Sequence, residues 1–374
     1  MIGIYVHVPF CKRKCPYCSF YSVVADQDTR ESYCQALVRN ISSFKGRGLR
    51  ADTLYFGGGT PSLLEPEQVS RIIGECRDSF GEDITEITLE ANPSSVSYDK
   101  LCRLREAGVN RLSVGFQSAD DEQLRFLGRL HDVKAARETV LSARKAGFEN
   151  ISADVMIGLA GQDKNSLEET INKLTKLPLE HISAYMLSIE EGTAFDCDRV
   201  RSSTADEELM GELYSHMCQM LEDKGFEHYE ISNFARNGRY SKHNLKYWQG
   251  EEYLGFGAAA HSFFEGKRYR CPDDVESFIS SPLQPCEILE EQVDPLEEYV
   301  MLGLRLSQGV KLDRVRQLSD AQTAGRILKK AQVLASYGLC RVQGNRIALT
   351  EKGFLLSNSV ICELLYRIDK NRGC

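Results

Sequence analysis

The sequence lacks the long apolar segments that membrane insertion requires. No apolar run approaches the roughly 20 residues that a transmembrane helix needs to cross a bilayer. The first residues, Met1 to Val8, also lack the basic start and long apolar core of a signal peptide. We therefore predict a cytoplasmic chain whose first strand begins almost at residue 1.

A surplus of basic residues is also missing. The chain has 46 Lys and Arg against 54 Asp and Glu, which gives a net charge of −8. Such a balance does not favour the phosphate-neutralising surface of a nucleic-acid-binding protein, so we expect no nucleic-acid partner. One basic run, Lys12-Arg13-Lys14, stands out. It is either a solvated loop or a contact for an anionic ligand.

The sequence also lacks the second pair of closely spaced cysteine or histidine ligands that a zinc site needs, although cysteine is abundant. The chain has 13 cysteines but no second CxxC or CxH pair that would complete a zinc site. Without an export signal a disulfide framework is not expected. Most of the cysteines are scattered, and we interpret them as small hydrophobic residues of the core or surface. Three are clustered in Cys11-Lys12-Arg13-Lys14-Cys15-Pro16-Tyr17-Cys18.

Short apolar, β-branched runs alternate with longer helical patterns through the first 200 residues. The candidate strands cover residues 2–8, 52–56, 84–90, 110–116, 151–157 and 181–187. The candidate helices cover residues 28–44, 65–79, 97–107, 120–127, 132–146 and 165–176. Units of about 30 residues indicate right-handed βαβ connections and a parallel sheet. We predict an α/β fold, a partial (β/α)6 barrel of the TIM type, with its chemistry at the carboxyl ends of the strands.

The pattern changes after residue 200. A helix near 205–224 precedes a glycine- and aromatic-rich stretch at 238–270, and prolines mark 281–295 as a linker. Residues 296–374 resemble a small, mostly helical α+β domain with a hairpin near 339–349 and a last helix near 351–369. The predicted domains are therefore 1–280, the barrel with its extension, and 296–374.

The cysteine cluster, CxxxCxxC, directly follows the first predicted strand. Thiolates are soft ligands that suit zinc or an iron–sulfur cluster. A structural zinc ion needs four protein ligands, and only Cys11, Cys15 and Cys18 are local. Three thiolates on a four-iron cluster leave one iron open for another ligand. The cluster interpretation is therefore favoured over a zinc-stabilised barrel without a redox role.

CxxxCxxC after the first strand of such a barrel resembles the radical S-adenosylmethionine (SAM) superfamily. The resemblance implies a 4Fe-4S cluster on the three cysteines, with SAM bound at the open iron. It also implies cofactor contacts from single positions along the chain. These positions are Tyr5, Tyr17, Gly58, Gly59, Thr60, Glu90, Gln117, Arg129 and Asp154. In this resemblance Tyr17 packs against the adenine, and the backbone at 57–61 meets the amino group of SAM.

These assignments have simpler alternatives. The glycines at 57–59 would also suit a tight turn between a strand and a helix. Glu90 or Arg129 would also suit a surface ion pair. Carboxylates nevertheless match ribose hydroxyls and an ammonium group, and arginine matches a carboxylate.

Within the superfamily the chain resembles the HemN/HemW family. The family's oxygen-independent coproporphyrinogen III oxidase carries a fourth cysteine where this chain has Phe20. The pattern His243-Asn244-Leu245-Lys246-Tyr247-Trp248 resembles a segment associated with haem binding in the HemW branch. His243 is the predicted haem ligand, since imidazole is a good axial ligand. His243 and Trp248 would alternatively be ordinary core residues.

The resemblance implies two functions. The first is a haem chaperone that binds haem, carries a SAM-ligated cluster and delivers haem to respiratory proteins. It would need an electron donor and is compatible with peripheral membrane contact. The second is oxidative decarboxylation of coproporphyrinogen III to protoporphyrinogen IX, which Phe20 disfavours. Whether the chain is an enzyme stays open at this point.

Overall fold

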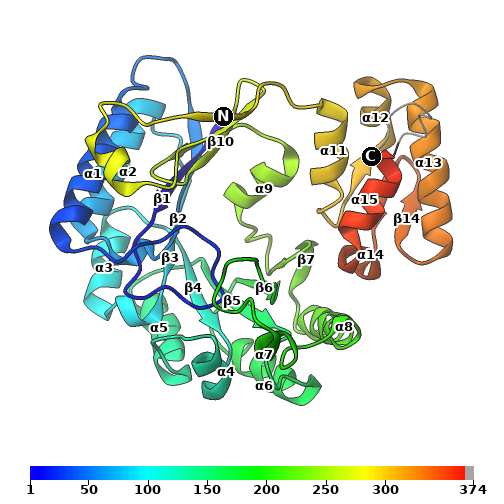
Figure 1. The fold of residues 1–374 in the computed structure, drawn as a ribbon, viewed down its shortest axis with the longest axis horizontal. Coiled ribbons are helices and arrows are strands. Elements are labelled where there is room, and N and C mark those ends of the chain that lie inside the picture. Colours follow the sequence, from blue (N-terminus) through cyan, green and yellow to red (C-terminus); the bar gives the residue numbers. More distant parts are fainter. Residues whose placement is uncertain (367–374) are drawn as a thin grey trace. The chain divides into compact units, whose positions relative to one another are not determined.

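The computed structural model describes residues 1–366 and divides into two compact units, which are treated separately below (Figure 1). The first unit comprises Met1–Glu227, Phe234–Lys246 and Glu251–Gln292. The second comprises His228–Asn233, Tyr247–Gly250 and the chain from Val293 onward.

The first unit is built on six parallel strands in sequential order. They are β1 (Ile2–Val8), β2 (Ala51–Gly58), β3 (Glu86–Ala91), β4 (Arg111–Gln117), β5 (Ile151–Ile157) and β6 (His181–Met186). Most residues of these strands are buried, as expected for a parallel sheet covered on both faces. The predicted α/β fold with strand–helix alternation is confirmed.

The connecting helices begin where the sequence places capping residues. They are α1 (Gln27–Ser42), α2 (Pro66–Phe80), α3 (Tyr98–Glu106), α4 (Asp121–Phe126), α5 (Val133–Lys145) and α6 (Lys164–Leu174). Asp26, Ser97 and Asp132 each accept a backbone N–H from the first turn of a helix. Such caps satisfy N–H groups that have no partner within the helix. Two 3-10 turns, Pro61–Leu63 and Pro93–Ser95, follow β2 and β3.

The extension adds strands at both ends of this sheet. Beyond β6 lies β8 (Asn233–Ala235). On the other side β9 (Tyr253–Phe256) pairs in parallel with β1, followed by the antiparallel strands β10 (His261–Phe264), β11 (Lys267–Arg270) and β12 (Glu287–Glu290). The helices of this part are α7 (Asp198–Arg201), α8 (Glu207–Asp223), α9 (Lys242–Gln249) and α10 (Val275–Ser280).

The linker predicted at 281–295 is therefore wrong in part, since it contains β12. All four residues of β12 are exposed, so no apolar alternation marks the strand in the sequence. Its backbone pairs with β11, which is the contact that defines it.

The second unit combines short helices with a small antiparallel sheet. The helices are α11 (Pro295–Gly303), α12 (Leu312–Leu318), α13 (Ala321–Ser336), α14 (Glu351–Leu355) and α15 (Ser357–Leu365). The sheet order is β13-β15-β14, with β13 (Val310–Lys311), β14 (Cys340–Gln343) and β15 (Arg346–Leu349). The strand β7 (Glu227–Glu230) begins at the boundary between the two units.

The single last helix predicted at 351–369 is corrected to two helices, and its end at 367–369 lies outside the described residues. The backbone leaves the helical region at Leu356, where φ is −109° and ψ is 23°. Ser357, at the start of α15, is buried and accepts a hydrogen bond from Arg305 at 3.2 Å. The change in direction lets Val360, Ile361 and Leu364 turn inward.

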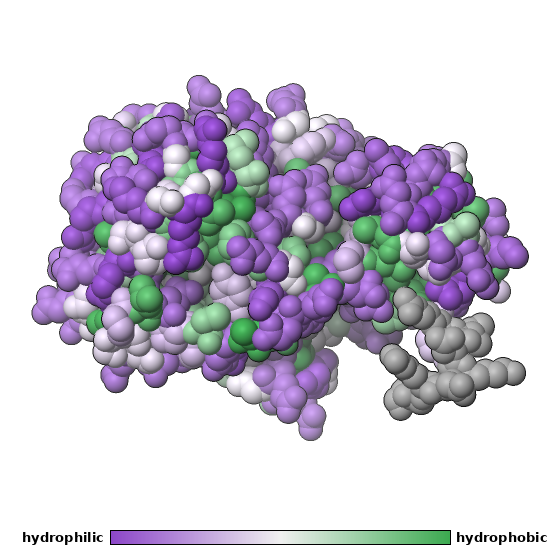
Figure 2. All heavy atoms as spheres, turned by 90° about the horizontal axis from the view of Figure 1, so that it is seen from above, coloured by the Kyte–Doolittle hydropathy of each residue, from purple (hydrophilic) through white to green (hydrophobic). Residues whose placement is uncertain are grey.

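Hydrophilic side chains cover most of the face seen in Figure 2, with small apolar areas between them. Within residues 1–366 no helix combines the length and the apolar character needed to cross a bilayer.

Candidate functional site

A cavity of about 510 Å³ lies at the carboxyl ends of the barrel strands. Eleven of the thirteen site residues predicted from the sequence line it. These are Cys11, Cys15, Tyr17, Cys18, Gly58, Gly59, Thr60, Glu90, Gln117, Arg129 and Asp154. Residues more than 140 positions apart are thus gathered by the parallel strands, whose carboxyl ends share one rim.

The three cysteines belong to one loop between β1 and α1. The loop is closed at its base, where the Cys11 N–H donates to Val23 O at 3.0 Å and the Val23 N–H donates to Pro9 O at 2.7 Å. Inside the loop the Cys18 N–H donates to Cys15 O at 3.1 Å. This short closed path turns all three thiols toward the same cavity.

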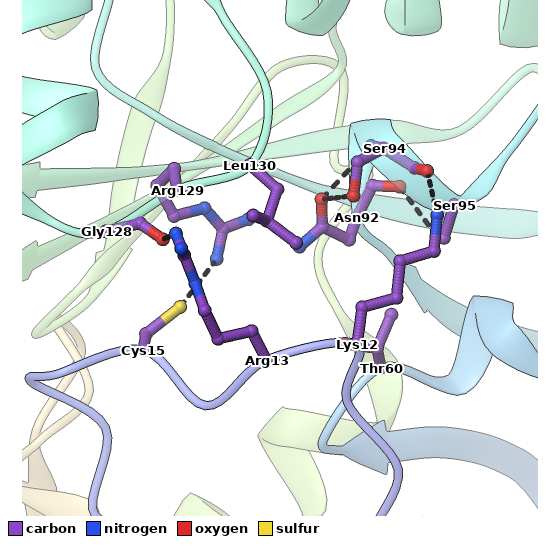
Figure 3. A pocket seen from close by; sticks show the side chains of 10 residues that line it. All are labelled: Lys12, Arg13, Cys15, Thr60, Asn92, Ser94, Ser95, Gly128, Arg129 and Leu130. Carbon is purple, nitrogen blue, oxygen red and sulfur yellow. Dashed lines mark hydrogen bonds between the residues drawn. The ribbon is translucent and has the colours of Figure 1, made fainter. Parts of the chain in front are cut away.

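The side chains of Lys12 and Arg13 connect the cysteine loop to two neighbouring loops through hydrogen bonds (Figure 3). Lys12 Nζ donates to Ser94 O at 2.6 Å, and Arg13 Nη2 donates to Gly128 O at 2.6 Å. The basic run is therefore more than a freely solvated loop. Its first two side chains join the cysteine loop to the loops after β3 and α4.

The glycine turn after β2 is shaped by close approach of the backbone. A Cβ on Gly59 would lie 2.8 Å from Phe10 O and 2.9 Å from Phe10 N, directly before Cys11. Gly58 has φ of +107°, a conformation that favours glycine, and its Cβ position lies 2.6 Å from the His7 ring. Thr60 Oγ1 then lies 3.5 Å from Cys11 Sγ. The turn is a tight one, and it also sets the position of the cysteine loop.

Two buried carboxyl groups face the cavity. Burial, and secondarily the charge of Asp154, raises the pKa of Glu90 to about 7. Burial likewise raises the pKa of Asp154, which accepts a hydrogen bond from Ser113 at 3.0 Å. Glu90 accepts from Tyr55 Oη at 2.8 Å and forms no surface ion pair among the described contacts. A cationic ligand would favour the charged form of both acids.

Arg129 lies between the cysteines and the strand ends. Its Nη1 donates to Cys15 Sγ at 3.7 Å, and its Nη2 donates to Gly115 O at 3.1 Å. Its buried Nε has no hydrogen-bond partner among the described residues. A buried donor without a partner marks a position for an anionic or carbonyl group of a ligand. The cavity therefore offers cationic, anionic and thiol groups in the combination that SAM and a cluster would use.

Tyr5 and His243 do not line the cavity. Tyr5 Oη lies 3.0 Å from His7 Nδ1, and the Tyr5 ring stacks against Tyr55 and His243. The His243 ring is 1% exposed, and its Nδ1 lies 2.9 Å from Thr53 Oγ1. Burial, then the positive charge of nearby Lys246, lowers the pKa of His243 to about 3. The cofactor roles predicted for Tyr5 and His243 stay predictions.

Several lining residues were not predicted from the sequence. Ser113 and Gly115 lie four and two residues before Gln117 on β4, and Met156 lies two residues after Asp154 on β5. Period-2 alternation along each strand, applied from one predicted site residue, would have found them.

Among residues 1–366, no three or more His, Cys, Asp or Glu side chains are gathered closely enough to hold a metal ion. A tetrahedral zinc site with bonds of about 2.3 Å needs sulfur atoms within about 4 Å of one another. Cys11, Cys15 and Cys18 line one cavity, and their number leaves the fourth position of a zinc site without a local cysteine ligand.

Comparison with known proteins agrees with this geometry. The radical SAM superfamily model matches residues 5–174, and the HemN C-terminal domain model matches residues 291–356. The Heme chaperone HemW of Bacillus subtilis is 36% identical over 371 residues, covering 96% of this chain and 98% of the relative. The chain belongs to the HemN/HemW family of the radical SAM superfamily. Its membership implies a 4Fe-4S cluster and SAM as cofactors.

Two further comparisons describe the family's range. The Heme chaperone HemW of Lactococcus lactis is 33% identical, covering 96% of each chain. The solved structure of coproporphyrinogen III oxidase (HemN) from Escherichia coli covers 97% of this chain and 89% of its own, with a TM-score of 0.82. At 23% identity that structure supports the fold of this radical SAM protein and no more.

Proposed function

We propose that this HemW-like protein is a haem chaperone that carries a SAM-ligated 4Fe-4S cluster and passes haem to haem-accepting proteins. The observation that carries the proposal is similarity over the full length to relatives named Heme chaperone HemW. A cytoplasmic location, an electron donor for the cluster and respiratory haem proteins as acceptors are part of the same proposal.

We assign the cofactor contacts from the cavity lining. Cys11, Cys15 and Cys18 would supply three thiolates to the cluster, and Arg129 would bind the SAM carboxylate. Glu90 and Asp154 would accept hydrogen bonds from its ammonium or ribose groups. The backbone at Gly58, Gly59 and Thr60 and the ring of Tyr17 would enclose the rest. When bound, the cluster would supply the electron that cleaves a carbon–sulfur bond of SAM, and the lining residues would orient the reactants.

Phe20 supports a chaperone over an oxidase. This side chain lines the cavity and is 64% exposed, at the position where the oxidase of the family has its fourth cysteine. The phenyl ring offers neither a ligand nor a proton donor there. Decarboxylation of coproporphyrinogen III is therefore the second candidate.

Binding of haem to His243 requires part of the protein to move. An axial ligand must bring a ring nitrogen to the haem iron. The His243 ring is buried against Thr53 and Gly3, so helix α9 would have to shift before haem could reach it. We therefore expect slow haem association compared with an open site.

The test is haem titration of protein reconstituted anaerobically with iron and sulfide. Wild type should develop a Soret band with a defined stoichiometry, and His243→Ala should lose at least tenfold in affinity. His216→Ala is the matched control, because His216 is a partly exposed histidine of α8 whose side chain pairs with Glu168. Circular dichroism checks that each variant is folded. Unchanged affinity in folded His243→Ala would remove His243 from the haem site.

The oxidase alternative has its own assay. Anaerobic incubation with coproporphyrinogen III, SAM and a reductant should give no sustained protoporphyrinogen IX. Repeated turnover in wild type, lost in Cys15→Ser, would replace the chaperone proposal by the enzymatic one.

A further inference from the structure

Two cysteines outside the cluster face each other across neighbouring strands. The register of β11 with β12 pairs Tyr269 with Ile288 and Arg270 with Glu287. Continued by one residue, this antiparallel register places Cys271 directly opposite Cys286. The sequence spacing alone does not show the pair, because 14 residues and helix α10 separate the two cysteines.

The hydrogen bonds define which type of cross-strand pair this is. The Cys271 N–H donates to Ala260 O at 2.8 Å, on the side of β10. In an antiparallel strand the N–H and C=O of one residue point to the same side, so Cys271 makes no ladder bond toward Cys286. Such non-hydrogen-bonded pairs have Cα atoms about 4.5 Å apart. That distance lies within the range of about 4.4–6.8 Å found for disulfides.

Residues directly opposite each other on antiparallel strands point to the same face, so the register places both thiols on one face. Burial, and then the neighbouring Cys286, raises the pKa of Cys271 to about 12. Cys286 also acts on Tyr269, whose pKa is raised chiefly by burial. Tyr269 and Cys271 are two residues apart on one strand and so share a face. The Cys286 side chain lies toward that face.

The segment that carries Cys286 is held in place by the rest of the unit. Arg39 donates to Ser281 O at 2.8 Å and to Pro282 O at 3.2 Å. The Gln284 side chain joins Gly255 O and the Gly257 N–H, at 3.0 and 2.9 Å. The opposed positions are therefore fixed from both sides. Cys271 is 1% exposed, whereas Cys286 is exposed and can meet a reagent from solution.

We propose that Cys271 and Cys286 form a reversible thiol–disulfide site that reacts with low-molecular-weight disulfides of the glutathione type. The Cys286 thiolate attacks one sulfur of the small disulfide, forms a mixed disulfide and releases one small thiol. The Cys271 thiol then attacks Cys286 Sγ and passes its proton to the departing small thiolate, which leaves as the second small thiol. Two protein thiols lose two electrons and two protons, and the small disulfide takes them up as two thiols.

A hydrogen bond links the segment between Cys271 and Cys286 to the end of the cysteine loop. Between the two cysteines, the Val275 N–H donates to Tyr21 Oη at 3.3 Å, and Tyr21 follows Cys18 by three residues. Closing the disulfide would constrain the segment that makes this contact. The inference does not depend on haem binding, so it stands or falls separately from the proposed function.

The test uses the full-length chain in anaerobic buffers with increasing ratios of oxidised to reduced glutathione. Free thiols are trapped with a maleimide, and peptides are mapped by mass spectrometry. We expect a peptide linked through Cys271 and Cys286 that grows with the oxidised fraction and disappears with dithiothreitol. Cys271→Ser should stop at the mixed disulfide on Cys286, because the resolving thiol is missing.

Cys197→Ser, which removes an exposed cysteine elsewhere in the same unit, should leave the linked peptide unchanged. Mapping separates the linked peptide from oxidation of the cluster cysteines. A pair that stays reduced at every ratio would overturn the proposal. A glutathione adduct that persists on Cys286 in the wild type would overturn it as well.

Discussion

Replacing Gly59 by alanine tests whether the glycine turn positions the cysteine loop. The added Cβ would lie 2.8 Å from Phe10 O and 2.9 Å from both Phe10 N and Val8 O. These distances fall about 0.6 Å short of the 3.4 Å at which ordinary contact begins. All three atoms belong to the backbone, so no side chain can rotate away. Overpacking of this kind costs about 1–3 kcal/mol, and relief requires Phe10 and the adjoining Cys11 to move.

We expect Gly59→Ala to lower the free energy of unfolding by that amount and to retain less iron after anaerobic reconstitution. Chemical denaturation and iron and sulfide analysis measure the two effects. Gly74→Ala is the matched control, because Gly74 lies within α2 with no atom near its Cβ position. That variant should gain about 0.5–1 kcal/mol from helix propensity. If Gly59→Ala matched wild type in both stability and cluster content, the positioning argument would be refuted.

Three other perturbations follow from the site and its surroundings. Glu90 has a folded pKa of about 7 against an ordinary 4.5, so wild type loses up to about 3 kcal/mol of stability as pH rises through this window. Glu90→Gln escapes this loss, and denaturation at pH 4.5 and pH 8 should show its advantage growing with pH. Lys246→Met removes the charge of a side chain that is 6% exposed and pairs with Asp52 and Glu251. We expect it to lower the free energy of unfolding by about 2–4 kcal/mol, against under 1 kcal/mol for Lys45→Met at an exposed ion pair. Lys12→Ala should leave stability within about 1 kcal/mol but speed loss of the cluster, measured by absorbance decay near 400 nm.

The barrel strands were predictable because they are buried on both faces. Parallel strands covered by helices carry continuous apolar runs, and the six predicted strands agree with β1 to β6 within two residues at each end. Helix starts were comparably clear, since the predicted helices 28–44 and 97–107 begin within one residue of α1 and α3. Local sequence therefore determined most of residues 1–186.

The later strands depend on partners far along the chain. β9 exists as a strand because it pairs with β1, some 250 residues earlier, and its four residues carry no period that a short window can recognise. β12 is an exposed edge strand without an apolar face. The break at Leu356 depends on what Ser357 and α15 contact within their unit. In each case tertiary pairing overrides weak local preference.

Two kinds of site residue differ in how the fold brings them to their positions. Residues that end a strand, such as Glu90 and Gln117, were named by the family resemblance, and the strand topology brings them to the cavity. His243 belongs to a short helix whose position is set by Thr53 and Glu86, each more than 150 residues away. The sequence motif identified His243 as a candidate ligand, but only the folded structure shows that this residue is buried.

The buried position of His243 determines how far a haem bound there would lie from the cysteine loop. His243 lies against Gly3 and Thr53, at the amino ends of β1 and β2, whereas the cysteine loop leaves the carboxyl end of β1. From Gly3 to Val8 a strand rises about 16 Å. Tyr5 and Tyr55 fill the interior between these levels, and a Cβ on Gly57 would lie 3.0 Å from both rings.

Haem held on His243 would therefore lie at the opposite end of the barrel from SAM. It could not be attacked directly by a radical formed in the cavity, because packed aromatic rings separate the two. Under the proposed function, haem would therefore be carried by the protein rather than transformed by it. The cluster would then serve transfer or its control, and haem affinity should be the same in Cys15→Ser as in wild type.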